Sequence, residues 1–293
     1  MSNFLLPFEI KKVSIEDDFY PKLLKGISGA PKILYWRGEL KKEEERCFAI
    51  VGTRRSSEYG KEIAFSIAQD LSGAGLTIVS GMARGIDSMA HKGALEGSGR
   101  TIAVLGTGLD EKSIYPQENL KLAKTILKNG GCLISEYPPG TRGTQFTFPE
   151  RNRIISGLSL GVLVVEAKTK SGALITAEWA RKQGKKVFAI PGSIHSLNSR
   201  GCHLLIKRGA KLVETVNDIL EELHLPKIKK EKITGETLEE NLILEVLKNG
   251  SLHIEKIVEK TNLPPQKVSA TLSLMEVEGK VRNLGGSIYT LSG

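Results

Sequence analysis

Residues 47–60, CFAIVGTRRSSEYG, place five apolar residues before a loop of glycine, threonine, arginine and serine, and the amphipathic pattern of a helix follows. This unit of apolar run, small-residue loop and helix recurs along the chain. Further buried strands are predicted at 76–80, 101–106, 132–136, 161–167, 186–192 and 210–214. Because continuous apolar strands that alternate with helices are typical of parallel sheets, we predict an α/β domain whose sheet carries helices on both faces.

The two ends of the chain differ from this central part. Residues 1–45 form a short lead-in to which the pattern assigns no fold of its own. A proline and the charged run after it predict a linker over 226–235. Residues 236–293 then show three helical segments and a hairpin around Gly285 and Gly286. Together these features predict a small winged-helix domain.

Composition restricts the classes of partner. The 293 residues include 42 Lys and Arg against 33 Asp and Glu, and this net charge of +9 favours anionic partners, although an ordinary basic protein is an alternative. The three cysteines are odd in number and widely separated, which predicts reduced thiols and neither a disulfide nor a zinc site. The chain starts without a secretory signal and shows no membrane-spanning run. We therefore predict a cytoplasmic protein with no membrane contact, metal or cofactor.

The first strand runs into a loop suited to an anion. In such sheets, ligands bind beyond the carboxyl ends of the parallel strands. Gly52, Thr53, Arg54 and Arg55 lie at such an end, ahead of a helix whose positive dipole end points at the same place. These residues predict an anion site, with an ordinary strand-to-helix turn as the alternative.

The second strand runs into a similar loop, SGMARG. Its candidate phosphate-binding residues are Ser80, Gly81, Arg84 and Gly85. We expect Asp87 to cap the helix that follows. The dinucleotide fingerprint G-x-G-x-x-G is absent from this loop, and His91 on that helix is interpreted as structural.

A longer loop with the sequence FPERNR mixes arginines with aromatic residues. Its candidate binding residues are Arg142, Phe148, Arg151, Asn152 and Arg153, and Lys168 and Lys170 follow the next strand. Guanidinium groups can hold phosphates while bases stack on aromatic rings, so this mixture indicates single-stranded nucleic acid. Core packing is the alternative for Phe146 and Phe148, and Ile154 and Ile155 are predicted to lie in the core.

The motifs GTRRSSEYG, SGMARGIDSMAHKGAL, SEYPPGT, FPERNRIISGLS and VVEAKTKSGALITAEWA occur in an order that resembles the DNA-processing protein A family, DprA or Smf. The resemblance covers residues 20–220 and implies an extended Rossmann-like parallel sheet over 46–225, with the winged helix as an accessory domain. It implies a homodimer that binds single-stranded DNA without strong sequence preference. It also implies that the protein protects incoming DNA in natural transformation and loads the RecA recombinase onto it. By the same resemblance, Arg54 and the FPERNR segment contact DNA, and the SGMARG loop holds phosphate.

Two features qualify the resemblance. Many members carry an additional N-terminal helical domain, where this sequence has only the lead-in, so the functions of that domain are left open. Charge separates the two predicted domains, because residues 226–293 hold only ten Lys and Arg against nine Asp and Glu. The presumed recognition helix, PPQKVSATLSLMEVEGK, contains no arginine. We therefore predict that the winged helix is not the principal DNA reader.

Two alternatives come from other classes of protein. One is a Rossmann-like nucleotide phosphoribohydrolase, because SGALITAE with Glu178 echoes the loop and helix acid of those enzymes, although their GG-x-GT core is missing. The other is a winged-helix transcription regulator, against which the near-neutral C-terminal charge argues. No catalytic residue is predicted for the main hypothesis.

Overall fold

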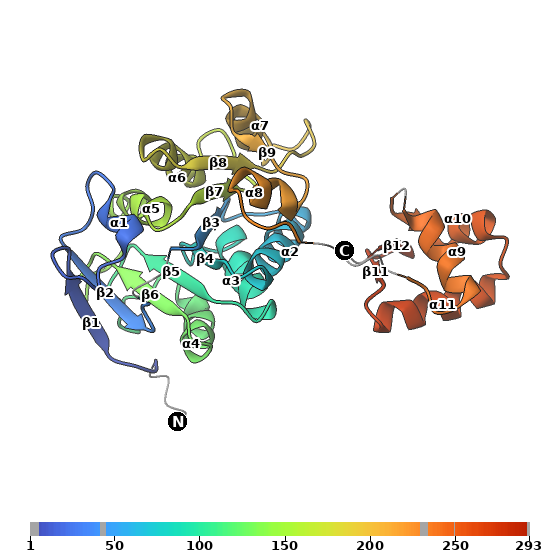
Figure 1. The fold of residues 1–293 in the computed structure, drawn as a ribbon, viewed down its shortest axis with the longest axis horizontal. Coiled ribbons are helices and arrows are strands. Elements are labelled where there is room, and N and C mark those ends of the chain that lie inside the picture. The colour runs from blue at the N-terminus through green and yellow to red at the C-terminus, as the bar shows by residue number, and fades with distance from the viewer. Residues whose placement is uncertain (1–5, 42–44, 229–233, 249, 292–293) are drawn as a thin grey trace. The chain divides into compact units, whose positions relative to one another are not determined.

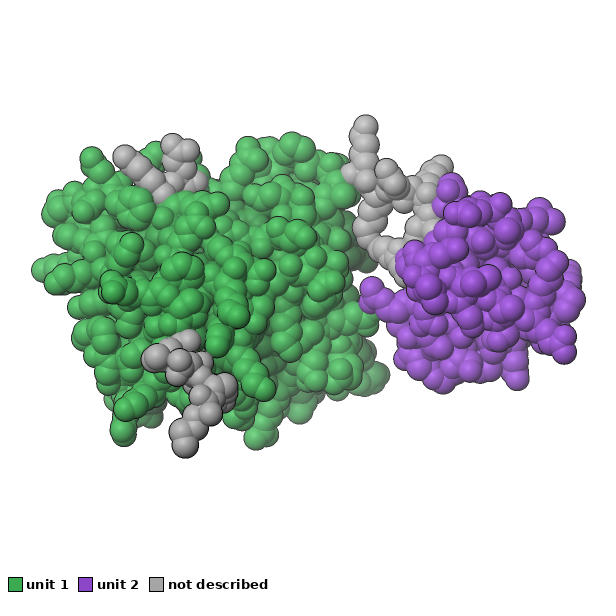
Figure 2. Space-filling view, turned by 90° about the horizontal axis from the view of Figure 1, so that it is seen from below, with its two compact units in different colours: residues 1–228 green, residues 229–293 purple. Residues whose placement is uncertain are grey.

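The computed structural model describes residues 6–41, 45–228, 234–248 and 250–291. The chain divides into two compact units, residues 1–228 and residues 229–293, which Figure 2 colours separately. The expected linker over 226–235 is described only in part, since its residues 229–233 lie outside the described ranges. Ile228 still belongs to the first unit, where its backbone N–H donates to the Asn217 side chain at 2.9 Å.

The first unit is built on one sheet in the order β1-β2-β6-β5-β4-β3-β7-β8-β9. Its strands are β1 Ile10–Ser14, β2 Ile33–Gly38, β3 Cys47–Val51, β4 Thr77–Ser80, β5 Thr101–Leu105, β6 Cys132–Ser135, β7 Gly161–Val164, β8 Lys186–Ala189 and β9 Lys211–Leu212. In this order, every pair of neighbours between β6 and β9 is parallel, and this part of the sheet includes β5, β4, β3, β7 and β8. The predicted α/β fold is confirmed, and most of the predicted strands end a few residues early, where their small-residue loops begin.

The sheet is mostly parallel rather than wholly parallel. β1 pairs antiparallel with β2, and β2 pairs antiparallel with β6. Both strands come from the first 45 residues, so this segment extends the sheet instead of preceding it. An antiparallel edge needs no crossover helix, which explains why the strand-and-helix pattern did not reveal it.

Helices cover both faces of this sheet (Figure 1). The helices are α1 Lys22–Lys25, α2 Glu58–Gly73, α3 Ile86–Glu96, α4 Leu120–Lys128, α5 Thr147–Gly157, α6 Gly172–Lys182, α7 Arg200–Lys207 and α8 Val216–Glu222, with a short 3₁₀ turn at Gln117–Asn119. One apolar layer joins α1, α5, α6 and α7 to the sheet, and a second joins α2, α3 and α8. The helix α4 packs in a third cluster beside them.

Local sequence accounts for several helix starts. Ser57 caps α2 by accepting from the Gly60 N–H, and Ser171 caps α6 by accepting from the Ala173 N–H. Asp87 was expected to cap α3, but the N-cap position is Gly85, whose φ of 75° suits glycine. All three cysteines are buried and unbridged, as predicted.

The second unit has its own core. It consists of α9 Leu238–Leu247, β10 Leu252–His253, α10 Ile254–Thr261, α11 Pro265–Val277, β11 Val281–Asn283 and β12 Ile288–Leu291. The hairpin of β11 and β12 pairs antiparallel, as predicted from the two glycines. Ile243, Ile257, Leu272 and Met275 are buried between the helices. This arrangement confirms the predicted winged helix.

Within the described parts of the chain, no helix is long and apolar enough to cross a membrane.

Candidate nucleic-acid interface

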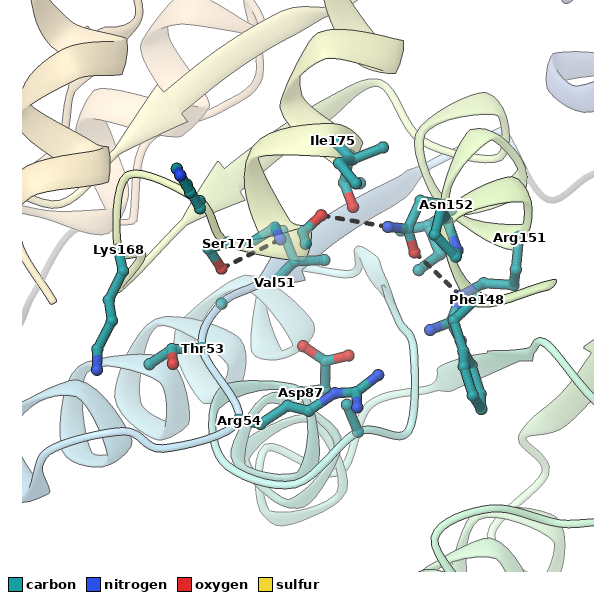
Figure 3. Close-up of a pocket in the computed structure, with 18 of the residues that line it drawn as sticks. Val51, Thr53, Arg54, Asp87, Phe148, Arg151, Asn152, Lys168, Ser171 and Ile175 are labelled. Atoms are coloured by element: carbon teal, nitrogen blue, oxygen red, sulfur yellow. Dashed lines mark hydrogen bonds between the residues drawn. The ribbon is translucent and has the colours of Figure 1, made fainter. Parts of the chain in front are cut away.

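A pocket of about 490 Å³ lies beyond the carboxyl ends of the central strands (Figure 3). This main pocket is lined by residues of the loops after β3, β4 and β7 and of the first turns of α5 and α6, including Gly52, Arg54, Phe148, Arg151, Lys168 and Gly172. In the sheet, β3 has β4 as its neighbour on one side and β7 on the other. The strands that follow β3 in the chain are first added on the β4 side and, from β7 on, on the opposite side. The pocket therefore lies at the point where strand order reverses, which is where open α/β sheets bind ligands.

The loop after β3 presents two arginines from a fixed backbone. The Thr53 N–H donates to the Glu166 carbonyl at 2.8 Å. The buried Glu166 carboxylate accepts from the Ser57 N–H at 2.9 Å and from the Ser57 hydroxyl at 2.6 Å. Between these anchors Arg54 and Arg55 are exposed. Their guanidinium groups are therefore available to an anion, while the loop itself is held at both ends.

Phe148 forms one wall of the main pocket. The Arg54 guanidinium lies over its ring at 5.4 Å from the centroid. A Cβ at Gly143 would lie only 2.4 Å from this ring, and one at Gly106 would lie 2.9 Å from it. The ring is half-buried and also packs against Tyr115 at 5.6 Å between centroids. Phe148 thus combines both interpretations left open by the sequence, because one side is packed and the other lines the pocket.

Arg151 is buried beneath the pocket, with only 5% of its surface exposed. It donates to the Gly81 carbonyl at 2.8 Å, to the Val104 carbonyl and to the Asn152 side chain at 3.2 Å. Burial lowers the pKa of Arg151 to about 10, and neighbouring Asp87 opposes that shift. The guanidinium stays charged at neutral pH, and its role here is to brace the floor of the pocket rather than to form an exposed rim.

Asp87 completes this buried cluster. Its carboxylate accepts from the Gly81 N–H at 3.1 Å. Burial raises the pKa of Asp87, and Arg151 and three backbone N–H groups oppose the shift. A Cβ at Gly81 would approach both Asp87 and Arg151 to 2.7 Å, so a side chain there would displace the ends of this buried pair.

The structure separates Arg153 from the pocket. Segment FPERNR begins the helix α5 instead of forming a loop, and residues two apart on a helix face different sides. Arg153 pairs with Glu136 at 2.6 Å and donates to the Gly29 carbonyl at 2.9 Å, toward the N-terminal segment. Of the two candidate arginines of this segment, Arg151 therefore lines the main pocket and Arg153 does not.

The remaining candidates divide into exposed cations and supporting residues. Lys168 and Lys170 are exposed at the start of α6 and line the main pocket, where the helix dipole also favours an anion. Figure 3 shows Lys168 and Phe148 on opposite sides of it. Arg142 is exposed outside the lining residues. Asn152 is buried and donates to the Gly172 carbonyl at 3.2 Å, which ties α5 to α6.

The loop after β4 lines a second, smaller pocket next to the main pocket. This side pocket, of about 180 Å³, is lined by Arg54, Arg55, Gly81, Ala83, Arg84, Tyr115, Pro116, Phe148 and Arg151. Ser80 is buried and donates to the Ile50 carbonyl at 2.6 Å, so its role is structural. A Cβ at Gly85 would lie 2.5 Å from the Thr53 carbonyl, which brings the two loops together.

Sequence reasoning missed Tyr115 and Gln145 as lining residues. The signal that could have identified Tyr115 is an aromatic ring beside a proline in the loop after β5. Glu178, on which the phosphoribohydrolase alternative depends, is exposed on α6 and lines neither pocket. That alternative therefore loses its proposed acid. Among the described residues, no cluster of His, Cys, Asp and Glu could hold a metal ion.

Comparisons with known proteins show the family of the chain. A family model described as DNA recombination-mediator protein A matches residues 11–224, and one described as DprA winged helix domain matches residues 229–287. Protein Smf of Escherichia coli is 46% identical over 211 residues, which cover 72% of this chain and 56% of that protein. DNA processing protein DprA of Streptococcus pneumoniae is 48% identical over 209 residues, covering 71% of this chain and 73% of its own.

Solved structures give the same result. The X-ray structure of DprA from Streptococcus pneumoniae matches with a TM-score of 0.68 at 46% identity, covering 73% of this chain and 74% of that one. A structure of DprA from Helicobacter pylori, described as giving insight into its single-stranded DNA binding mode, matches with a TM-score of 0.65 at 31% identity. This second match covers 74% of this chain and 96% of that one.

Proposed function

The chain belongs to the DNA recombination-mediator protein A family, and from this premise we propose that it binds single-stranded DNA at the carboxyl edge of its sheet and delivers the strand to a recombinase. The observation that carries the proposal is the main pocket. Four exposed cations, Arg54, Arg55, Lys168 and Lys170, line it together with the half-buried aromatic ring of Phe148. This pairs phosphate-binding charge with a base-stacking surface.

The shape of the site favours a strand over a free nucleotide. The side pocket adjoins the main pocket, because Arg54, Phe148 and Arg151 are among the residues that line both. A mononucleotide would occupy one hollow, whereas consecutive nucleotides can occupy both. In a duplex the bases are stacked on one another, so their faces are not available to Phe148. We therefore expect single strands to bind more tightly than duplex of equal length.

The site offers affinity without reading a base sequence. Guanidinium and ammonium groups bind the phosphates of any strand, and an aromatic ring stacks on any base. Arg151, Asp87 and Asn152 are buried and hold the loops in place, so their polar groups are not free to read base edges. The expected binding is therefore tolerant of sequence.

The finer steps of the function are part of the same proposal. The description of the matched family as a recombination mediator supports transfer of the bound strand to RecA. Protection of incoming DNA during natural transformation, assembly as a homodimer and a cytoplasmic location are proposed on family membership alone. A pulldown of RecA with the full chain, with and without single-stranded DNA, tests the transfer step.

The binding proposal is tested by fluorescence anisotropy with a labelled single strand, with duplex and a mononucleotide as competitors. We expect the single strand to compete best and Arg54→Ala to weaken its binding about tenfold, since a hydrogen bond to a charged group contributes about 1.5–3 kcal/mol. Arg181→Ala is the matched control, because this exposed arginine lies in the last turn of α6, away from the pocket. Equal competition by duplex, or equal affinity of both variants, would contradict the proposal.

A further inference from the structure

The side pocket contains an aromatic residue that the proposed function has not used. Tyr115 is 50% exposed, and its ring lies 5.6 Å from that of Phe148 at an interplanar angle of 43°. The two rings are therefore tilted against each other, and half of the Tyr115 side chain stays exposed. A tyrosine placed this way presents a flat apolar surface to the hollow beside it.

The loop that carries Tyr115 is tied to the loop after β4. The Asn119 amide donates to the Met82 carbonyl at 2.8 Å and to the Ser88 hydroxyl at 2.9 Å. The Gln117 amide donates to the Ile114 carbonyl at 3.0 Å. These bonds hold the loop on the C-terminal side of Tyr115 and so keep its Cα beside the loop after β4.

Charge completes the side pocket. Arg55 and Arg84 line it together with Tyr115. Arg84 pairs with Glu118 at 2.6 Å, and the two side chains are 60% and 51% exposed. An ion pair as exposed as this contributes little, so Arg84 can exchange Glu118 for a phosphate.

The size of the side pocket limits its occupant. Its volume of about 180 Å³ is well below that of the main pocket, about 490 Å³. It is also below the roughly 300–1,000 Å³ typical of pockets that enclose a whole small ligand. The side pocket thus has room for one ring system, while the attached sugar and phosphate would lie along the arginines at its edge.

We propose that the side pocket takes the base of a second, adjacent nucleotide of the bound strand, with Tyr115 as its stacking surface and Arg84 on a phosphate. This inference rests on the proposed single-strand function. The Arg54 and Phe148 pair then forms a partition between two consecutive nucleotides and contacts both. Tyr115 becomes a binding residue of the same interface.

Affinity measurements with Tyr115→Ala and Tyr115→Phe test the proposal on an oligothymidylate. We expect Tyr115→Ala to weaken binding roughly five- to a hundredfold, as for the loss of one base stack, and Tyr115→Phe to keep the affinity. The salt dependence should stay unchanged in both. Tyr59→Ala is the matched control, because Tyr59 is 48% exposed on α2 and lines neither pocket.

A second measurement separates stacking from a structural role of Tyr115. On a strand of abasic nucleotides, Tyr115→Ala should bind as the unchanged protein does, since no base is present to stack. An oligothymidylate in which one thymidine is replaced by 5-iododeoxyuridine should crosslink to Tyr115 when its complex with the unchanged protein is irradiated. Mass spectrometry identifies the residue that carries the adduct.

The outcomes distinguish this inference from the proposed function. Unchanged affinity of Tyr115→Ala, an equal loss on abasic strands, a loss in Tyr115→Phe, or adducts that form elsewhere but not at Tyr115 would each overturn the stacking role. If Arg54→Ala still loses affinity in that case, the single-strand function stands. Failure of the unchanged protein to bind single strands would overturn both.

Discussion

The cations of the two units are arranged differently. At the edge of the sheet, Arg54, Arg55, Lys168 and Lys170 are exposed and make no ion pair with any residue that the structure describes. In the winged helix, by contrast, lysines pair with glutamates across short distances. These pairs are Lys248–Glu245, Lys256–Glu259, Lys267–Glu239 and Lys280–Glu240. Net charge alone does not reveal this difference, because a cation that is paired with a carboxylate must exchange that partner before it binds a phosphate.

The largest effect should come from removing the unpaired cations together. Replacing Arg54, Arg55, Lys168 and Lys170 by alanine should weaken single-strand binding about ten-thousandfold, because four losses of about 1.5 kcal/mol each, the lower value for a hydrogen bond to a charged group, add up. The slope of log affinity against log salt should flatten by about 0.7 for each phosphate that the protein no longer neutralises. Anisotropy titrations over a range of salt concentrations measure both quantities.

The matched control removes paired cations from the other unit. Lys248, Lys256 and Lys267 are exposed, and their replacement by alanine should leave the affinity and the salt slope unchanged. A comparable loss in both variants would show that binding follows total charge, and the distinction between paired and unpaired cations would fail.

Phe148→Ala should give the next largest effect. The ring supports the Arg54 guanidinium and lines both pockets. Losing one base stack should weaken binding by about 1–3 kcal/mol, with little change in the salt slope. Phe146→Ala is the control, because Phe146 is 68% exposed two residues earlier and lines neither pocket. A flatter salt slope in Phe148→Ala would instead assign its effect to the displacement of Arg54.

His91 provides a prediction about stability. Burial lowers its pKa to about 3, and nearby Arg151 lowers it further. In the unfolded chain the pKa is about 6.5, so between these values the unfolded state binds more protons and stability falls as pH falls. At about pH 5 this amounts to roughly 2 kcal/mol of lost unfolding free energy.

Urea denaturation at several pH values checks this contribution. His91→Gln should show a shallower loss of stability between about pH 7 and about pH 5 than the unchanged protein does. His195→Gln is the matched control, because His195 is exposed. Parallel pH profiles for all three proteins would mean that His91 does not titrate on unfolding.

The sequence predicted the sheet well where a strand is followed by a helix. The apolar runs located β3 to β8, because parallel strands buried on both faces leave a strong signal, and a run at 210–214 also located the exposed edge strand β9. It did not predict β1 and β2. Most residues of these two strands are not fully buried, so they form no continuous apolar run. Of the candidate site residues, Arg54, Arg55, Lys168 and Lys170 line the main pocket, and their contact with DNA stays a prediction. The sequence did not show that Arg151 is buried beneath the pocket while Arg153 points elsewhere. That difference depends on which face of the helix α5 packs against the sheet.

The smallest effect should come from removing the winged helix. The first unit has its own apolar clusters, so a chain ending at residue 228 should fold. The α11 helix exposes Leu274 at 63% and Val277 at 88%, a surface better suited to a protein than to phosphates. We therefore expect the truncated chain to bind single strands within about twofold of the full chain, since its unpaired cations remain and their binding to phosphates provides most of the affinity. If the truncated chain kept its melting temperature but bound tenfold more weakly, the winged helix would share in DNA binding despite its paired lysines.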